Sequence, residues 1–419
     1  MSTSAAAHSG QRSYRTNPVK PPDNIASSAL QAHSPEADAA IEAVVRVSTL
    51  ELFFDLVFVF TITQLTTVFA NHATARGLLQ VVLMFGVIWW MYGGYAWLTN
   101  AVAPDRPLRR LLLMGGMAAF LVLALAIPRA FSGSGVAFGL AYLAVVCVHA
   151  GLFASTASEH IVRAVLGISR FNLVTALLVL VGGIVGATAE YLLWAAALLF
   201  AWTTPKLIDD SGFEIAPAHF VERHGLVVII TIGESIVAIG VVAAGLPVNL
   251  ALVGVALLGL ALSACLWWTH FGGDEERAER ALSAAPREQR PRLAVNAFGY
   301  WHLPILFGVL AIAAAEKRAT GHGFAHLRAP LAAALAGGVA VFLLGDVLFR
   351  RSLGIGRARG RAIVAVLALA TVPLGTEISA AAQMARTPCC APGAGLPASR
   401  AAARCALGST RSRRTPAWT

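Results

Sequence analysis

Long apolar runs separated by short polar loops limit most strongly what this chain can fold into. A run of about 20 apolar residues spans a bilayer as a helix, the conformation in which a single segment satisfies its own backbone hydrogen bonds in lipid. Eleven candidate runs cover approximately residues 50–70, 78–98, 110–127, 135–154, 170–187, 189–204, 225–245, 248–270, 297–315, 329–349 and 361–384. We therefore predict an all-α, polytopic membrane bundle of about 11 (10 to 12) transmembrane helices.

The composition supports this class and excludes others. Hydrophobic residues make up 57% of the 419 residues and charged residues only 13%, against roughly 25% charged in a typical soluble protein. The net charge of +10 comes from Arg and Lys spread over loops rather than gathered in one stripe, so no nucleic-acid partner is expected. The expected surroundings are a lipid bilayer.

Three parts of the chain differ in character. Residues 1–46 are rich in Ala, Ser and Pro and lack an apolar signal segment, which predicts a disordered cytoplasmic extension. Residues 47–385 form the transmembrane domain. Residues 386–419 replace the apolar pattern with Cys, Pro, Ala and Arg, which indicates a disordered or aberrant tail, and we hypothesise that a frameshift has replaced a last helix there.

A faint internal repeat divides the transmembrane domain. The segment FTITQL at 60–65 and the segment ITIGES at 230–235 superimpose at an offset of 170 residues. An ancient duplication would give two related halves, 47–204 and 219–385. Transporters often place a binding site between such halves.

Loop charges predict the orientation. With the N-terminus inside, 18 loop Arg and Lys lie on the inner side and 5 on the outer side. Loops that retain Arg and Lys face the cytoplasm. We predict a cytoplasmic N-terminus in a bacterial inner membrane.

Glu234 is the most unusual residue of the apolar runs, because it lies about halfway along the run 225–245. An acid at the centre of a bilayer costs about 3 kcal/mol on insertion scales. Arg223 lies on the same helical face but roughly 16 Å away, too far to pair. His302, two residues before Pro304, is the predicted partner. The alternative is a protonated Glu234 that only holds helices together.

The first run carries Glu51, Asp55 and Gln64. The two acids are four residues apart and share a helix face, with Gln64 roughly opposite Asp55. They are suited to gather a proton or small cation. Alternatively, Glu51 only favours the helix N-terminus and Asp55 pairs with an arginine. Arg223 is expected at the cytoplasmic border, with Asp55 or Glu222 as its partner.

Further polar and aromatic positions have simpler interpretations. Glu377 lies well inside the eleventh run without a local partner, and Asp346 is predicted to pair with Arg350 one turn on. We predict that His149 packs inside the bundle and forms a hydrogen bond there. The aromatic clusters that end the second and eighth runs, at 89–97 and 267–268, are expected to be interfacial anchors.

No metal, cofactor or enzyme motif is recognised. His219, Glu222 and His224 have the spacing HxxExH, which matches neither zinc motif HExxH nor HxxEH, and the three side chains do not share one helix face. No serine, cysteine or metal-ligand motif of a catalytic kind is seen. We expect no metal and no cofactor, and an enzyme is the less favoured class.

Four segments carry a resemblance to a known family: ELFFDLVFVFTITQL at 51–65, WLTNAVAPDRPLRR near 97–110, HFVERHGLVVIITIGESIVAIG at 219–240 and YWHLPILFGVLAIAAAE at 300–316. Over about residues 46–385 the chain resembles the bacterial low temperature requirement protein A family. The resemblance implies a multi-pass inner-membrane protein, named for a growth requirement in the cold, whose biochemical activity is not established. Its matching polar positions are Glu51, Asp55, Gln64, Glu222, Arg223, Glu234, Ser235, His302 and Glu316.

Two classes of function remain. In the first, intramembrane carboxylates bind a proton or small cation and move an unknown small solute or ion across the membrane. In the second, the protein is a non-transport component that adapts the membrane to cold or stress, structurally or through regulation, or, less favoured, an enzyme acting on a lipid-linked substrate. The sequence leaves the solute and the oligomeric state undetermined.

Overall fold

The computed structural model describes residues 47–101, 104, 106–155, 159–207 and 215–388, with the backbone alone for residues 159–166. All regular secondary structure in these ranges is helical, as predicted. The predicted cytoplasmic extension, 1–46, and the tail from residue 389 onward lie outside the described residues.

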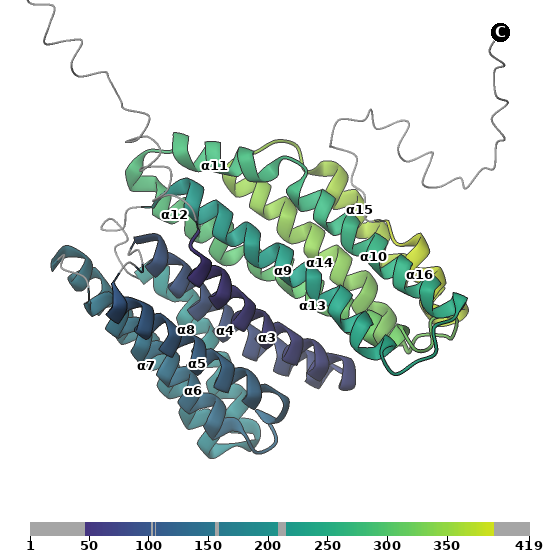
Figure 1. Ribbon diagram of the computed structural model, residues 1–419, viewed down its shortest axis with the longest axis horizontal. Helices are drawn as coiled ribbons and strands as arrows, with labels where there is room; N and C mark the ends of the chain where they lie inside the picture. The colour runs from purple at the N-terminus through teal and green to yellow at the C-terminus, as the bar shows by residue number, and fades with distance from the viewer. Residues whose placement is uncertain (1–46, 102–103, 105, 156–158, 208–214, 389–419) are drawn as a thin grey trace, which may run out of the picture. The chain divides into compact units, whose positions relative to one another are not determined.

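The helices follow one another with short connections. They are α3 (Thr49–Asn71), α4 (Ala75–Ala101), α5 (Pro107–Ala126), η1 (Ile127–Arg129), α6 (Gly135–Ala154), α7 (Glu159–Val185), α8 (Ala187–Leu207), α9 (Pro217–Ala243), α10 (Leu250–Phe271), α11 (Asp274–Ala284), η2 (Arg287–Gln289), α12 (Arg290–Ala294), η3 (Val295–Tyr300), α13 (His302–Ala319), α14 (Ala329–Leu353), α15 (Arg359–Leu369), η4 (Leu374–Ile378) and α16 (Ala380–Arg386). Figure 1 shows their order from purple to yellow.

Ten helices in the described part of the chain are long and apolar enough to cross a membrane, within the predicted 10 to 12. The sixth predicted run became α8, a helix of 21 residues that is not among the ten. Its apolar residues are diluted by Glu190 near its start and by a polar Thr-Thr-Pro-Lys end.

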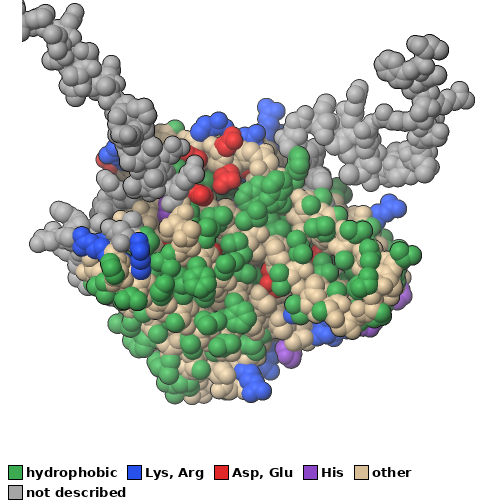
Figure 2. Space-filling view, viewed as in Figure 1, with side chains coloured by type: hydrophobic (Ala, Val, Ile, Leu, Met, Phe, Trp, Pro, Cys, Tyr) green, Lys and Arg blue, Asp and Glu red, His purple; other side chains and the backbone are tan. Residues whose placement is uncertain are grey.

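Hydrophobic side chains cover much of the outer surface of the bundle. Large apolar residues such as Leu125, Leu192, Leu199 and Leu257 are more than half exposed, and Figure 2 shows hydrophobic side chains across one face with Lys and Arg toward its margins. Exposed apolar area of this extent would be costly in water and is typical of contact with lipid.

Helix α3 connects the two predicted halves. It packs against α4 and α5 on one side and against α9 and α13 on the other. Its start is fixed by a capping box, in which Ser48 and Glu51 satisfy each other's backbone N–H groups. The two segments of the faint repeat lie in α3 and α9, so they face each other across this contact.

Helices α9 and α13 run side by side in the same direction. His224 of α9 packs against His302 of α13 at 5.5 Å between ring centroids, and Ser235 interacts with Glu316 further along both helices. Earlier residues of α9 therefore lie beside earlier residues of α13, and later residues lie beside later ones.

A π-helix, η3, interrupts the ninth run just before His302. Pro304 lacks the backbone N–H that would continue regular α-helical bonding to Tyr300. In this break, the Gly299 carbonyl accepts a hydrogen bond from the Trp89 indole at 2.7 Å. The predicted break at Pro304 is therefore present, and it faces another helix of the bundle.

The eleventh predicted run, 361–384, is not one helix. Helix α15 ends at Leu369, η4 follows, and the chain reverses at Ser379, whose hydroxyl accepts the N–H of Ala382 and starts α16. The candidate span in this region is therefore Arg359–Ile378, and the extended backbone of Ser379 explains why it does not continue to residue 384.

Candidate functional site

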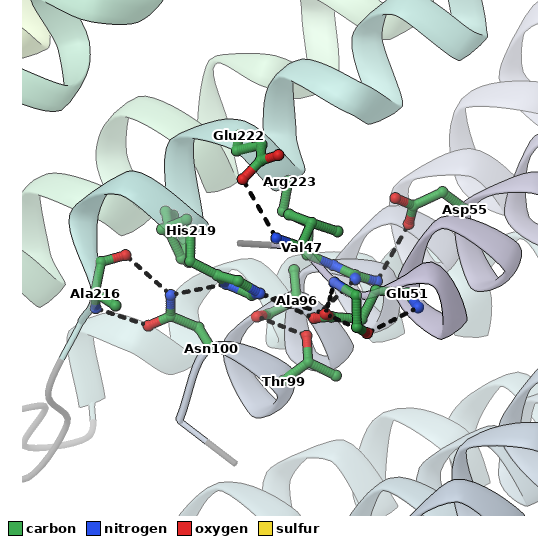
Figure 3. A network of polar contacts seen from close by, with 12 residues as sticks. Val47, Glu51, Asp55, Ala96, Thr99, Asn100, Ala216, His219, Glu222 and Arg223 are labelled. Atoms are coloured by element: carbon green, nitrogen blue, oxygen red, sulfur yellow. Dashed lines mark hydrogen bonds and ion pairs between the residues drawn. The ribbon is translucent and has the colours of Figure 1, made fainter. Parts of the chain in front are cut away.

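Buried charges at the N-terminal ends of α3 and α9 form what we call the Arg223 cluster: Glu51, Asp55, Tyr92, His219 and Arg223. The Arg223 guanidinium lies 3.1 Å from Glu51 Oε1 and 3.2 Å from Asp55 Oδ1, with 1% of the arginine side chain exposed. His219 Nε2 lies 3.2 Å from Glu51, and the Tyr92 hydroxyl donates to Asp55 at 2.9 Å. Figure 3 shows the Glu51, Asp55, His219 and Arg223 side chains pointing toward one another from α3 and α9.

Of the two predicted partners of Arg223, the structure shows Asp55. Glu222 points elsewhere and accepts the backbone N–H of Val47 at 3.3 Å. Glu51 makes the predicted N-terminal cap but is also an ion-pair partner, which the simpler interpretation did not include. The Arg223 cluster therefore has both acids in contact with one arginine, which stays charged in proteins.

Three of the five aromatic residues that end the second run are not interfacial anchors. Trp89, Tyr92 and Tyr95 are buried within the bundle, and Tyr92 and Trp89 donate the hydrogen bonds already described. The prediction was wrong because sequence position near a helix end does not show which face turns inward. Trp267 and Trp268 are 38% and 61% exposed, as anchors would be.

A second polar set lies further along α3 and α9 and on α13, and we call it the Glu234 cluster: the buried Glu234, Ser235 and Glu316 and the half-buried Thr63, Thr67 and Lys317. Thr63 Oγ1 of α3 donates to Glu234 Oε2 at 2.6 Å. Lys317 Nζ of α13 donates to Thr67 Oγ1 at 2.8 Å and interacts with the Glu234 carboxylate. Glu234 lies 17 residues after the start of α9, which is about 26 Å along the helix.

The two carboxyl groups of the Glu234 cluster are poorly satisfied. Glu234 is 2% exposed and Glu316 is 1% exposed. Among the described residues, Glu234 Oε1 and both carboxyl oxygens of Glu316 have no hydrogen-bond partner of normal geometry, and neither has the Ser235 hydroxyl beside Glu316. Unpaired buried carboxylate oxygens are costly unless a proton or an ion meets them.

Helix α10 approaches Glu316 from the other side. A Cβ placed on Gly259 would lie 3.3 Å from Glu316 Oε1 and 2.4 Å from the Ile239 side chain. The absence of a side chain at residue 259 is therefore what leaves room for the Glu316 carboxyl between α9, α10 and α13.

His302 is not the partner of Glu234, so that prediction was wrong. It lies at the level of His224 and His270, with ring centroids 5.5 and 5.7 Å away, and its Nδ1 contacts the Ala297 carbonyl at 3.1 Å. His224 precedes Glu234 by ten residues, about 15 Å along α9. The position of α13 along α9 depends on the preceding elements α12 and η3. The apolar pattern of the sequence does not show this position.

The remaining predicted site residues separate from these clusters. Gln64 is half-buried on α3, next to Thr63, which makes the contact with Glu234. Glu377 is exposed in η4, beside a loop where Thr376 O contacts His326 Nδ1 at 2.9 Å. The prediction that Glu377 lies well inside a span was wrong, because the chain reverses two residues later.

A third polar group, the Arg361 cluster, was only partly predicted: His270, Asp274, Asp346, Arg350 and Arg361. Asp346 pairs with Arg361 and with His270, while Arg350 pairs with Asp274. Arg361 Nη1 also lies 2.8 Å from Asp274. The predicted Asp346–Arg350 pair was therefore wrong, since α11 and α15 supply closer partners than the next turn of α14.

Thr63, Lys317 and Asp274 were not among the predicted site residues. There was little reason in the sequence to choose them. A threonine in an apolar helix most often bonds to its own backbone, and Lys317 looks like a charge in a loop. No group of three or more His, Cys, Asp or Glu side chains within the described ranges is arranged to hold a metal ion.

Most of the chain matches one known protein family. Residues 46–393 match the family described as bacterial low temperature requirement A protein (LtrA). The chain belongs to this family. The family match covers α3 to α16, and thus all three clusters, and together with the apolar helices it makes the chain a multi-pass membrane protein.

A relative in Rhizobium meliloti (strain 1021), the uncharacterized protein RA0937, is 31% identical over 319 residues, which cover 72% of this chain and 76% of that protein. No solved structure matches the chain. Within this LtrA chain, the segments around ELFFD, GES and YWHLP meet at the contact of α3, α9 and α13.

Proposed function

We propose that the protein moves a proton or a small monovalent cation across the membrane, alone or coupled to a small solute, and that Glu234 and Glu316 bind it. The observation that carries the proposal is a pair of buried carboxyl groups in which three of the four oxygens, Glu234 Oε1 and both of Glu316, have no hydrogen-bond partner of normal geometry among the described residues. Ionisable residues inside membrane helices are costly and commonly mark ion and substrate pathways.

Charge counting supports a monovalent ligand. Two carboxyl groups and one ammonium, that of Lys317, occupy the Glu234 cluster. If both acids are ionised, one negative charge is left uncompensated in a low-dielectric interior, which is expensive. One proton or one monovalent cation removes that charge, and its departure restores it. Such a site can load and unload.

The Arg223 cluster is assigned a different role. Its two acids both lie within ion-pair distance of a guanidinium that does not lose its proton, and Glu51 also contacts His219. We propose that the Arg223 cluster holds α3 and α9 together at the end of the bundle away from the Glu234 cluster. From the loop charges, we place the Arg223 end on the cytoplasmic side of a bacterial inner membrane.

Proton flux into liposomes tests the proposal. The full chain is reconstituted with an internal pH-sensitive dye, and a potassium gradient with valinomycin supplies the driving potential. We expect flux above that of protein-free liposomes and a loss of about tenfold or more in Glu234→Gln and in Glu316→Gln, as for other essential proton-transfer groups. Sodium and potassium flux are measured in parallel.

The matched control is Glu377→Gln, which makes the same change at an exposed carboxyl group and should leave flux unchanged. Wild-type liposomes with no proton, sodium or potassium flux would contradict the proposal and favour the non-transport class. Equal flux in wild type and in both buried-site variants would contradict the assignment of the two carboxyl groups.

A further inference from the structure

A cavity of about 130 Å³ lies among α4, α6, α7, α8 and η3, outside all three polar clusters. Its walls include four large aromatic side chains, Trp89, Trp90, Trp97 and Phe153. An engineered cavity of about 150 Å³ in another protein holds a benzene ring. The space is therefore suited to a molecule built on one aromatic ring.

Hydrogen bonds hold two of the tryptophan rings in place. The Trp89 indole N–H donates to the Gly299 carbonyl at 2.7 Å, and that of Trp90 donates to Asn172 Oδ1 at 3.1 Å. The Trp89 ring stacks on Tyr92 at 5.2 Å between ring centroids, and the Trp90 ring lines the cavity beside it, where an aromatic ligand could pack against it. Gly93 lines the same cavity, and a Cβ placed on it would meet nothing within 4 Å.

His149 supplies the polar group of the cavity. It is 3% exposed and packs between Tyr95 and Phe153, with ring centroids 5.2 and 5.1 Å away. Neither ring nitrogen makes a hydrogen bond of normal geometry with a described residue. The predicted packing is present, and the imidazole interacts with the backbone of Gly94, which supports the predicted hydrogen bond for one ring nitrogen. A neutral imidazole offers one donor and one acceptor.

We propose that this cavity binds a small, uncharged aromatic molecule with a hydroxyl or carbonyl group, its ring among the tryptophans and its oxygen on His149. The ring would supply van der Waals contacts to the cavity walls, and the oxygen would give the buried imidazole a hydrogen bond of normal geometry, which neither ring nitrogen makes with a described residue. The inference goes beyond the ion site and does not depend on transport.

The test uses ¹⁹F NMR of 4-fluorophenol and 4-fluorotoluene with the detergent-purified full chain. The two probes differ in the polar group and share the ring. We expect saturable binding of both to the wild type, with 4-fluorophenol the tighter. His149→Leu should weaken 4-fluorophenol about tenfold, the value of roughly one hydrogen bond, and leave 4-fluorotoluene unchanged.

Gly93→Leu fills the cavity and should abolish saturable binding of both probes. The matched control is Gly254→Leu on α10, another helical glycine where an added Cβ would meet nothing within 4 Å, and this variant should bind as the wild type does. Saturable binding that survives Gly93→Leu would overturn the site. Equal weakening of both probes by His149→Leu would overturn the role of the imidazole.

Discussion

Arg223 shows most clearly how single residues organise this membrane bundle. Its guanidinium lies within ion-pair distance of Glu51 and Asp55 and is 5.6 Å from the Phe54 ring centroid, with almost no exposed surface. Removing one partner of a buried ion pair leaves an uncompensated charge, which costs about 3–5 kcal/mol.

We therefore expect Arg223→Met to lower the thermal stability of the purified protein severely. Arg223→Lys should also destabilise it, because one ammonium cannot reproduce the planar contacts to two carboxylates. Thermal unfolding in detergent measures both. The control is Arg106→Met, which removes an exposed arginine and should change stability by less than about 0.5 kcal/mol. Similar melting for both methionine variants would contradict this role.

The sequence predicted some of the polar side-chain pairs correctly and others wrongly, for a physical reason. Arg223 and Asp55 were linked correctly because both lie near the same end of their runs. Glu234 and His302 were linked wrongly because helix position says nothing about the relative levels of two helices. Asp346 was misassigned because Arg350 is close in sequence, while Arg361 and His270 come from other elements.

At the scale of elements, close helix packing depends on particular glycines. A Cβ on Gly308 of α13 would lie 2.5 Å from the Gly338 carbonyl oxygen, and a Cβ on Gly338 of α14 would lie 2.7 Å from that of Gly308. Small residues at such contacts let two membrane helices approach backbone to backbone. The apolar pattern alone predicted both helices, but not that these glycines face each other.

Gly308→Ala should destabilise the protein by about 1–3 kcal/mol, because the added methyl group would push α13 away from α14. Gly337→Ala is the matched control. It lies beside Gly338, has nothing within 4 Å of a Cβ, and should be neutral or stabilising by up to about 1 kcal/mol, since alanine favours helix. Chemical unfolding in mixed micelles measures both. A neutral Gly308→Ala would refute this packing argument.

At the scale of the whole molecule, the sequence predicted the fold class because apolar runs of this length have few other solutions in lipid. It predicted neither the reversal at Ser379 nor the inward-facing aromatic side of α4, since both depend on packing between distant segments. The orientation is a prediction from loop charges, with residue 129 outside and residue 206 inside.

Cysteine labelling in cells checks that orientation. In a variant with Cys147, Cys265, Cys389, Cys390 and Cys405 replaced by serine, Arg129→Cys should react with a membrane-impermeant maleimide in intact cells. Lys206→Cys should react only after permeabilisation. Both positions are exposed, so accessibility within the protein does not separate them. The reverse pattern would invert the proposed topology.

The central claim is that Glu234 and Glu316 form one ion site, and a double-mutant cycle on proteoliposome flux tests it most directly. Groups that act as a unit are not additive. We predict that flux in the variant carrying both Glu234→Gln and Glu316→Gln is no lower than in the weaker of the two single variants. Losses that multiply, or a double variant with wild-type flux, would contradict a shared site.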